Sequence, residues 1–231
     1  MVKLFMRLDI SSRAEPIHKL LGNGIEKRCI TNFYGLPGAG KTQVALCIAA
    51  SLVEEGEKIV FVDTETGFSF ERFLELCEGK RALLKNIILF EPCTWDEQKS
   101  LIQKIKKIKA SAVIVDSLVA LWRIELGEEN AQKLSRELSR FIAELATIAK
   151  KNDLAVITTN QVYTEIESGE LELSGRYIVK WWSKNLIELI HSGRAGKRIA
   201  VLKKSRTQKE EKKVAFEITR TGLKEVKLGI F

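Results

Sequence analysis

The chain has 231 residues, 45% of them hydrophobic, and a formal net charge of +8. This length and composition suit one well-packed α/β domain, and no apolar run approaches the roughly 18 residues that a membrane-spanning helix needs. The four cysteines form no Cys-x-x-Cys pair and lie mostly in apolar runs, which argues against disulfides or a zinc site. The start of the chain is too short and too charged for a signal peptide, so we expect a cytoplasmic protein.

Apolar strands alternate with amphipathic helices along the chain as far as Thr158. Parallel, buried strands are predicted at Cys29–Tyr34, Lys58–Val62, Asn86–Phe90, Ala112–Val115 and Leu154–Thr158. Helices are predicted at Thr42–Glu55, at Phe70–Cys77, from Thr94 past Leu101, Ile105 and Ile108, and at Asn130–Lys151. The expected fold class is therefore α/β, with a mostly parallel central sheet flanked by helices.

The last part of the chain has a different pattern. Three short alternating segments, separated by glycine or charge-rich turns, predict antiparallel strands added to the sheet: Leu186–His191, Arg198–Leu202 and Val214–Ile218. We expect a single domain over 1–231, in which a lead-in (1–28) precedes a nucleotide-binding core (29–162), a connecting region (163–183) and a basic antiparallel extension (184–231).

The most informative motif is a phosphate-binding loop between the first predicted strand and helix. Its pattern, G-x-x-x-x-G-K-[ST], is complete in Gly35, Leu36, Pro37, Gly38, Ala39, Gly40, Lys41 and Thr42. Glycines let successive backbone N–H groups converge on one anion, and the following helix offers its unpaired N–H groups and the positive end of its dipole. On this template Lys41 reaches the β- and γ-phosphates and Thr42 gives a hydroxyl to Mg²⁺. The motif predicts a nucleoside triphosphate site.

Three polar residues follow predicted strands at the edge where α/β sheets bind ligands. Asp116 ends an apolar strand, where its carboxylate can hold Mg²⁺ beside Thr42. Glu65 can polarise an attacking water, or it can be a helix-capping acid. Gln161 can bond the γ-phosphate, or it can be a structural amide. A hydrolytic site is thus expected at one edge of the sheet.

Several motifs together resemble the RecA/RadA recombinase superfamily, and within it a short archaeal branch. The resemblance covers almost the whole chain and is carried by Ile30–Tyr34 with the phosphate loop and Gln43, Asp63–Glu65 with Phe70–Arg72, Val115–Ser117 with Leu121–Arg123, and Thr159–Val162. It implies a RecA-type core that binds ATP and Mg²⁺. It also implies that Glu65 activates water, that Gln161 couples the γ-phosphate to a DNA-binding loop, and that Arg72 lies near the adenine.

The sequence also departs from full-length members of this superfamily. The chain begins only about 30 residues before its phosphate loop, so we expect the N-terminal helix-hairpin-helix domain and the polymerisation motif to be absent. The regions matching the two DNA-binding loops are acidic, and the second of them is the connecting region 163–183. The acids are Glu125, Glu128 and Glu129 in the first region and Glu165, Glu167, Glu170 and Glu172 in the second. Acidic side chains repel phosphates, which weakens the expectation that DNA lies along the usual filament axis. Tyr163, Trp181 and Trp182 are candidates either for stacking on bases or for core packing.

The basic character is concentrated at the C-terminus, where Arg176–Phe231 holds 15 Lys and Arg against 5 Asp and Glu. This asymmetry indicates a polyanionic partner, although a solvated surface rich in Lys and Glu is the alternative. Lys203, Lys204 and Arg206 resemble an element that reaches the γ-phosphate of a neighbouring subunit. They can instead belong to a patch that contacts the DNA backbone.

These observations predict an ATP-binding and DNA-binding accessory protein of homologous recombination and repair. We expect weak Mg²⁺-dependent ATPase activity, binding to single- or double-stranded DNA without sequence preference, and a RadA-like recombinase as partner, while homo-oligomerisation is left open. One alternative is a binding module switched by ATP with negligible hydrolysis. Another is a clock-protein-like RecA-fold ATPase or kinase, against which the Asp63–Glu65 and Phe70–Arg72 matches argue.

Overall fold

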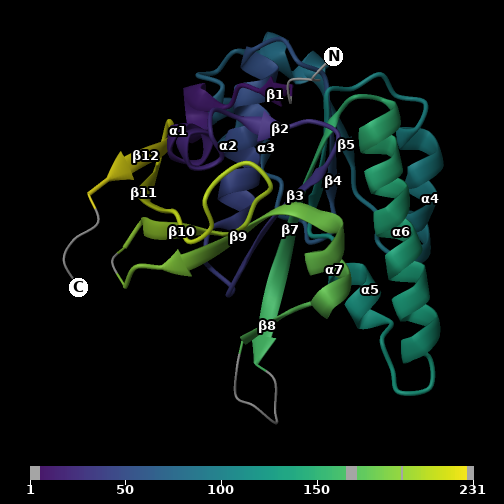
Figure 1. The fold of residues 1–231 in the computed structure, drawn as a ribbon. Coiled ribbons are helices and arrows are strands. Elements are labelled where there is room, and N and C mark those ends of the chain that lie inside the picture. The colour runs from purple at the N-terminus through teal and green to yellow at the C-terminus, as the bar shows by residue number, and fades with distance from the viewer. Residues whose placement is uncertain (1–5, 165–170, 194, 228–231) are drawn as a thin grey trace, which may run out of the picture.

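A computed structural model describes residues 6–164, 171–193 and 195–227. Figure 1 shows a twisted central sheet with helices on both sides. Its strands follow the spatial order β12-β11-β10-β9-β3-β7-β6-β4-β5, with β8 paired to β7. Within the described ranges, no helix combines the length and apolar character that a bilayer crossing requires.

The central strands of the sheet are parallel. They comprise β3 (Ile30–Gly35), β4 (Ile59–Asp63), β5 (Ile87–Phe90), β6 (Ala112–Asp116), β7 (Ala155–Thr164) and β9 (Ser183–His191). Antiparallel strands continue from β9 as β10 (Lys197–Lys204), β11 (Lys213–Thr219) and β12 (Gly222–Val226). The short β8 (Leu171–Leu173) runs antiparallel to β7, and β1 (Arg7–Leu8) pairs with β2 (Ile25–Glu26) apart from the main sheet.

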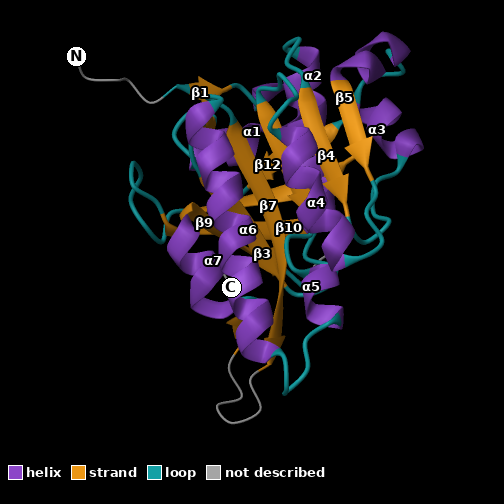
Figure 2. Ribbon diagram, turned by 90° about the vertical axis from the view of Figure 1, so that its right-hand side faces the viewer, coloured by secondary structure: helices purple, strands orange, loops and turns teal. Residues whose placement is uncertain are grey.

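Helices cover both faces of the sheet (Figure 1), and Figure 2 looks onto one of these faces. They are α1 (Ser11–Leu20), α2 (Lys41–Glu54), α3 (Phe70–Leu76), α4 (Trp95–Ile105), α5 (Ala120–Ile124), α6 (Ala131–Lys151) and α7 (Arg176–Trp182). A 3₁₀ helix (Arg81–Asn86) leads into β5. The predicted α/β class, mostly parallel with antiparallel C-terminal strands, is confirmed.

Two hydrophobic cores lie on opposite faces of the sheet because successive strand side chains point to opposite sides. Phe33, Phe61 and Ile114 pack with the helices α1, α2 and α3. Val60 and Val113 belong to the other core, which contains side chains from α4, α5, α6 and α7. The strands are buried on both faces, which explains their nearly continuous apolar sequences.

The predicted elements differ from the observed ones in several places, and the elements β1, α1, β2, α5, β8 and α7 are not among the predicted ones. Helix α4 ends at Ile105 and turns tightly, so Ile108 packs against the core from outside the helix. Strand β9 was predicted among the antiparallel strands, but it pairs in parallel with β3 and forms the junction to β10. Strand β12 was not predicted. It begins at Gly222, whose φ of +135° and whose backbone approach to Arg13 leave no room for a side chain.

The register of the parallel strands brings the candidate site residues to one edge. Gly35 pairs with Gln161, and Asp63 pairs with Asp116. Strand β7 lies between β3 and β6, so Gln161 emerges between the phosphate loop and Asp116. The carboxyl ends of these strands form the edge at which open α/β sheets bind ligands.

Candidate nucleotide site at the carboxyl edge

The phosphate loop closes the gap between β3 and the start of α2. Gly38 and Gly40 have φ values of +76° and +91°, which residues with a Cβ rarely adopt. Helix α2 has no side-chain cap and no acidic residue in its first turn, whereas α3 and α4 are capped by Ser69 and Thr94. The first N–H groups of α2 are therefore available to an anion, as the sequence predicts.

Lys41 lies across the mouth of this loop. Its Nζ donates to the carbonyl oxygens of Gly35 and Leu36, each at 3.0 Å. Burial lowers the pKa of Lys41, while the nearby carboxylates of Glu65 and Asp116 oppose that change. The ammonium group is thus partly desolvated and held by two neutral acceptors, which phosphate oxygens, being charged, can replace with stronger bonds.

Asp116 and Thr42 meet beneath the loop and provide oxygen ligands suited to Mg²⁺. The Asp116 carboxyl is buried and accepts hydrogen bonds from the hydroxyls of Thr159 and Thr42. Burial raises the pKa of Asp116 despite these bonds, and the negative charges of Glu65 and Asp63 raise it further. Such a carboxylate is stabilised by a cation, so the residues present fit Mg²⁺ held together with phosphate oxygens. No cluster of three or more His, Cys, Asp or Glu in the described ranges could hold a metal ion by itself.

Glu65 is fixed by hydrogen bonds from strand β7 and from the residue that follows strand β6. Ser117 Oγ donates to Glu65 Oε1 at 2.5 Å, and Gln161 Nε2 donates to Glu65 Oε2 at 3.1 Å. The preceding Asp63 accepts from the backbone N–H groups of Glu65, Gly67 and Phe68, which shapes the loop after β4. The structure therefore joins the predicted water-activating acid to the predicted γ-phosphate amide.

A hollow of about 360 Å³ unites most of the predicted residues. Its lining includes Pro37, Gly38, Gly40, Lys41, Thr42, Gln43, Glu65, Asp116 and Gln161. Arg72 is not among the lining residues. Its guanidinium donates to the Gln43 side chain at 3.0 Å and to the backbone carbonyls of Thr219 and Arg220 at 2.7 and 2.8 Å. Arg72 thus links α3 to the end of β11, and its place near an adenine stays a prediction.

Arg198 lines the same hollow, although sequence reasoning placed it with the basic C-terminal residues. It reaches the loop from β10 and donates from Nη2 to the Gly38 carbonyl at 2.9 Å. Its Nε is buried without a partner in the described structure, and burial lowers the pKa of Arg198. A cation and an unused N–H donor therefore face the loop from the same chain. Its spacing from the loop in sequence gives no signal of this proximity.

The other C-terminal cations turn to partners within the chain. Lys203 forms an ion pair with Glu211 at 2.6 Å, and the Lys204 Nζ donates to the Lys180 carbonyl at 2.7 Å. Arg206 bonds to Glu26, which is fully buried, with Nη2 at 2.6 Å and Nε at 2.9 Å from the same oxygen. Their roles toward a neighbouring subunit or DNA stay predictions.

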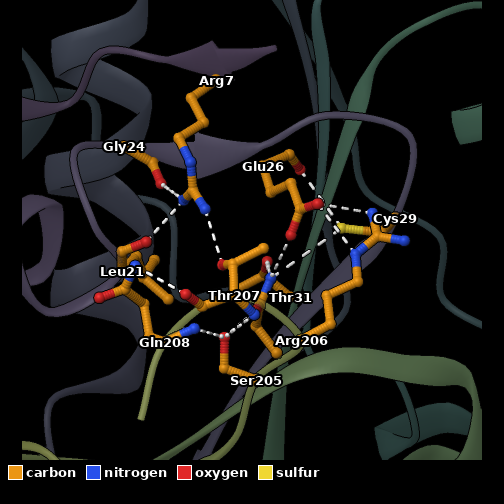
Figure 3. A network of polar contacts seen from close by, with 11 residues as sticks. Arg7, Leu21, Gly24, Glu26, Cys29, Thr31, Ser205, Arg206, Thr207 and Gln208 are labelled. Atoms are coloured by element: carbon orange, nitrogen blue, oxygen red, sulfur yellow. Dashed lines mark hydrogen bonds and ion pairs between the residues drawn. The ribbon is translucent and has the colours of Figure 1, made fainter. Parts of the chain in front are cut away.

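A polar network surrounds the Arg206 contact (Figure 3). Asn185 donates to Glu26 and Thr31 and accepts from Ser205, while Arg7 bonds to Thr207. This network fastens the loop after β10 to the N-terminal strands β1 and β2.

The structure describes the first acidic loop region and only part of the second. Glu125, Glu128 and Glu129 are exposed between α5 and α6. Glu165, Glu167 and Glu170 lie outside the described residues. The acidic character of the first region is therefore a surface property.

Comparisons with known proteins agree with this geometry. A model of the Rad51 family matches residues 5–226. The chain belongs to the Rad51 family. A protein named DNA repair and recombination protein RadB from Methanosphaera stadtmanae is 38% identical over 215 residues, covering 90% of this chain and 92% of the relative. Another of that name from Methanococcoides burtonii is 37% identical, with coverage of 94% and 97%.

A solved structure supports the same assignment. The crystal structure described as that of the RadB recombinase superposes with a TM-score of 0.81 at 32% identity, covering 94% of this chain and all of the other. The resemblance to RecA/RadA recombinases and to their short archaeal branch is thereby confirmed. Membership of the Rad51 family implies a nucleotide bound with Mg²⁺, which agrees with the phosphate loop and the Asp116–Thr42 pair.

Proposed function

We propose that this chain binds ATP with Mg²⁺ at the phosphate loop and acts in DNA repair and recombination, the processes for which its RadB relatives are named. One observation carries the proposal: a lysine, two carboxylates and an amide converge on a single hollow at the uncapped start of α2, from Lys41, Asp116, Glu65 and Gln161. The continuous sheet supports one RecA-like ATPase domain over residues 1–231.

Each residue has a role that its present contacts support. Lys41 exchanges the two loop carbonyls for phosphate oxygens, while Thr42 and Asp116 hold the metal. When bound, Mg²⁺ would neutralise negative charge on the phosphates. Glu65 orients a water molecule and accepts its proton. Gln161 bonds to Glu65 and couples it to strand β7, in which Gln161 lies. Arg198 steadies the loop through Gly38.

We propose that hydrolysis is slow and that the protein is an accessory to a RadA-like recombinase on DNA of either form. Two donors already bond to the Glu65 carboxylate, so fewer of its lone pairs are free to accept a hydrogen bond from water. The exposed glutamates between α5 and α6 disfavour phosphates at the first loop position. The same engagement of Glu65 favours a second candidate function, a binding module for which ATP is a conformational ligand and hydrolysis is negligible.

Calorimetric ATP titrations and phosphate-release assays with Mg²⁺ test these proposals. Lys41→Ala is expected to weaken ATP binding about 100-fold, because charge-assisted bonds to phosphate contribute about 1.5–3 kcal/mol each. Glu65→Gln is expected to retain ATP binding while phosphate release falls about 10²- to 10⁴-fold. Lys58→Ala, at an exposed lysine before β4, serves as the control.

The outcomes separate the candidates. Wild-type affinity for ATP in Lys41→Ala would contradict the nucleotide site. If Glu65→Gln leaves the rate of phosphate release unchanged, Glu65 does not take part in hydrolysis. If neither wild type nor Glu65→Gln releases phosphate while ATP changes DNA affinity in both, the binding-module function is the correct one.

A further inference from the structure

The outer side of α7 carries two exposed aromatic rings. Tyr177 is 75% and Trp181 72% exposed, and their spacing of four residues places them on one side of the helix. The adjacent Trp182 instead packs against the core beneath α6. Two large uncovered rings side by side are unusual for a soluble surface and indicate a binding site.

A trough runs along these rings between α6 and α7, which lie side by side in Figures 1 and 2. It consists of three adjoining hollows of about 720, 590 and 720 Å³. The first two share Tyr177, and the last two share Trp181. Small side chains of α6, Ser135, Ser139 and Ala146, line the opposite side. The rings therefore stand beside a continuous hollow wide enough for planar groups.

Charge is distributed unevenly around α6. Its glutamates, Glu137 and Glu144, point to α4, where they pair with Lys99 and Lys106. The side facing the trough presents cations. Among the described residues that line the three hollows, Asp153 is the sole acid, and Lys27 and Arg28 neutralise it.

Four of the lining cations are exposed and have no ion pair within the described structure: Arg123, Arg136, Lys150 and Lys184. Arg136 and Lys150 extend from α6 and Lys184 from β9, so these three cations follow the row of aromatic rings. Exposed cations beside exposed ring faces are the two elements that a non-specific single-strand site requires.

We infer that this α6–α7 trough binds a single strand of nucleic acid, with bases stacked on Tyr177 and Trp181 and phosphates beside Arg136, Lys150 and Lys184. In a duplex the base faces are covered by their neighbours, whereas an unpaired base can stack on an aromatic ring. Stacking and phosphate contacts do not read base edges, so binding is independent of sequence. The inference rests on the proposed function for the identity of the polymer as DNA. The acidic loop between α5 and α6 reaches the first hollow through Leu126, and the stacking rings and the three cations lie along the rest of the trough.

Fluorescence anisotropy with a labelled oligothymidylate of about 20 nucleotides, over a range of salt concentrations, tests the site. Each aromatic ring replaced by alanine is expected to weaken binding between about fivefold and a hundredfold. The conservative double variant Tyr177→Phe with Trp181→Phe keeps the ring faces and should retain affinity. The substitution Trp181→Phe should also abolish most of the tryptophan quenching that the oligonucleotide causes.

The charges are tested with a matched pair of variants. Arg136→Glu with Lys150→Glu should weaken binding and flatten the log–log salt slope by about 1.4, since each phosphate contact on a single strand contributes about 0.7. Lys107→Glu with Lys109→Glu makes the same charge change at exposed positions after α4 and should leave the slope nearer to that of wild type. ATP affinity, expected to be unchanged in every variant, confirms folding.

Wild-type oligonucleotide affinity and salt slope in the variant Tyr177→Ala with Trp181→Ala would overturn the inference and leave the proposed function intact. A variant that keeps DNA affinity but loses self-association in light scattering would show that a second copy of the chain occupies the trough, which also overturns it. Absence of DNA binding by the wild-type protein, with ATP binding intact, would instead contradict the DNA part of the proposed function.

Discussion

The carboxyl edge of the parallel strands and the C-terminal segment (residues 183–227) use their charged residues in different ways. At the edge, Lys41, Glu65 and Asp116 converge on one hollow, and burial changes the pKa values of Lys41 and Asp116. In the C-terminal segment, Lys203 and Arg206 diverge to separate carboxylates. Convergence of charge at the cost of desolvation indicates a functional site, whereas dispersed pairs indicate structure. A count of charged residues does not distinguish the two.

The largest effect is expected from Arg206→Ala, which should lower the free energy of unfolding by about 3 kcal/mol because it leaves the buried Glu26 carboxylate without its cation. Urea unfolding measures this change. Arg220→Ala is the control, since Arg220 is exposed and lies 3.6 Å from Glu75. If Arg206→Ala costs no more stability than Arg220→Ala and instead reduces phosphate release, Arg206 belongs with the catalytic region.

Asp116→Asn is expected to stabilise the nucleotide-free protein at neutral pH. Burial raises the pKa of Asp116 in the folded state, so the unfolded chain loses this proton first as the pH rises. Wild type therefore loses stability between about pH 4, the unfolded pKa, and the raised folded pKa, and the variant escapes that loss. Urea unfolding at several pH values without Mg²⁺ measures the difference.

The same variant should lose most of the additional stability that Mg²⁺ and ATP give to wild type, because its amide is a poorer ligand than a carboxylate. Thermal shifts with and without Mg²⁺ compare the two. An equal rise in unfolding temperature in both proteins would show that Asp116 does not hold the metal. It would also weaken the contrast between the two regions.

The smallest effect is expected from Lys203→Ala, which breaks an ion pair between largely solvent-accessible side chains. Such pairs contribute about 0.2–1 kcal/mol, and high salt should reduce the difference from wild type further. Urea unfolding at low and high salt provides the measurement. A loss comparable to that of Arg206→Ala would show that the C-terminal cations act as one coupled network.

The predicted residues of the candidate site lie together in the structure because the sequence signals that point to them are local. The phosphate loop is one continuous turn, and Glu65 and Asp116 follow strands whose parallel arrangement brings their ends to the same edge. Arg198 was missed as a lining residue because its contact with Gly38 spans 160 positions. The Arg206–Glu26 bond spans 180 positions. Such contacts join loops and strands that are far apart in the sequence, so they depend on tertiary packing that local apolar patterns do not specify.

The fold shows the same limit. Hydrophobic periodicity identified the central strands and the buried face of α6, which includes Leu134, Leu138 and Leu145. It assigned β9 to the antiparallel group because β9 has the same alternating pattern as β10. Which neighbour a strand pairs with, and in which direction, depends on tertiary packing that such a pattern cannot reveal.

Strand β10 forms a hydrogen bond near each of its ends, and together these two bonds connect the phosphate loop to helix α7. Arg198 near one end holds the Gly38 carbonyl, and Lys204 at the other holds the last turn of α7 through the Lys180 carbonyl. Six residue steps along the strand place these points about 20 Å apart. A ligand that moves the Gly38 carbonyl away from Arg198 breaks the bond near one end of β10. The other end stays bonded to α7, the helix that carries Tyr177 and Trp181. Faster amide exchange in α7 on addition of ATP would show that the two ends of β10 are coupled.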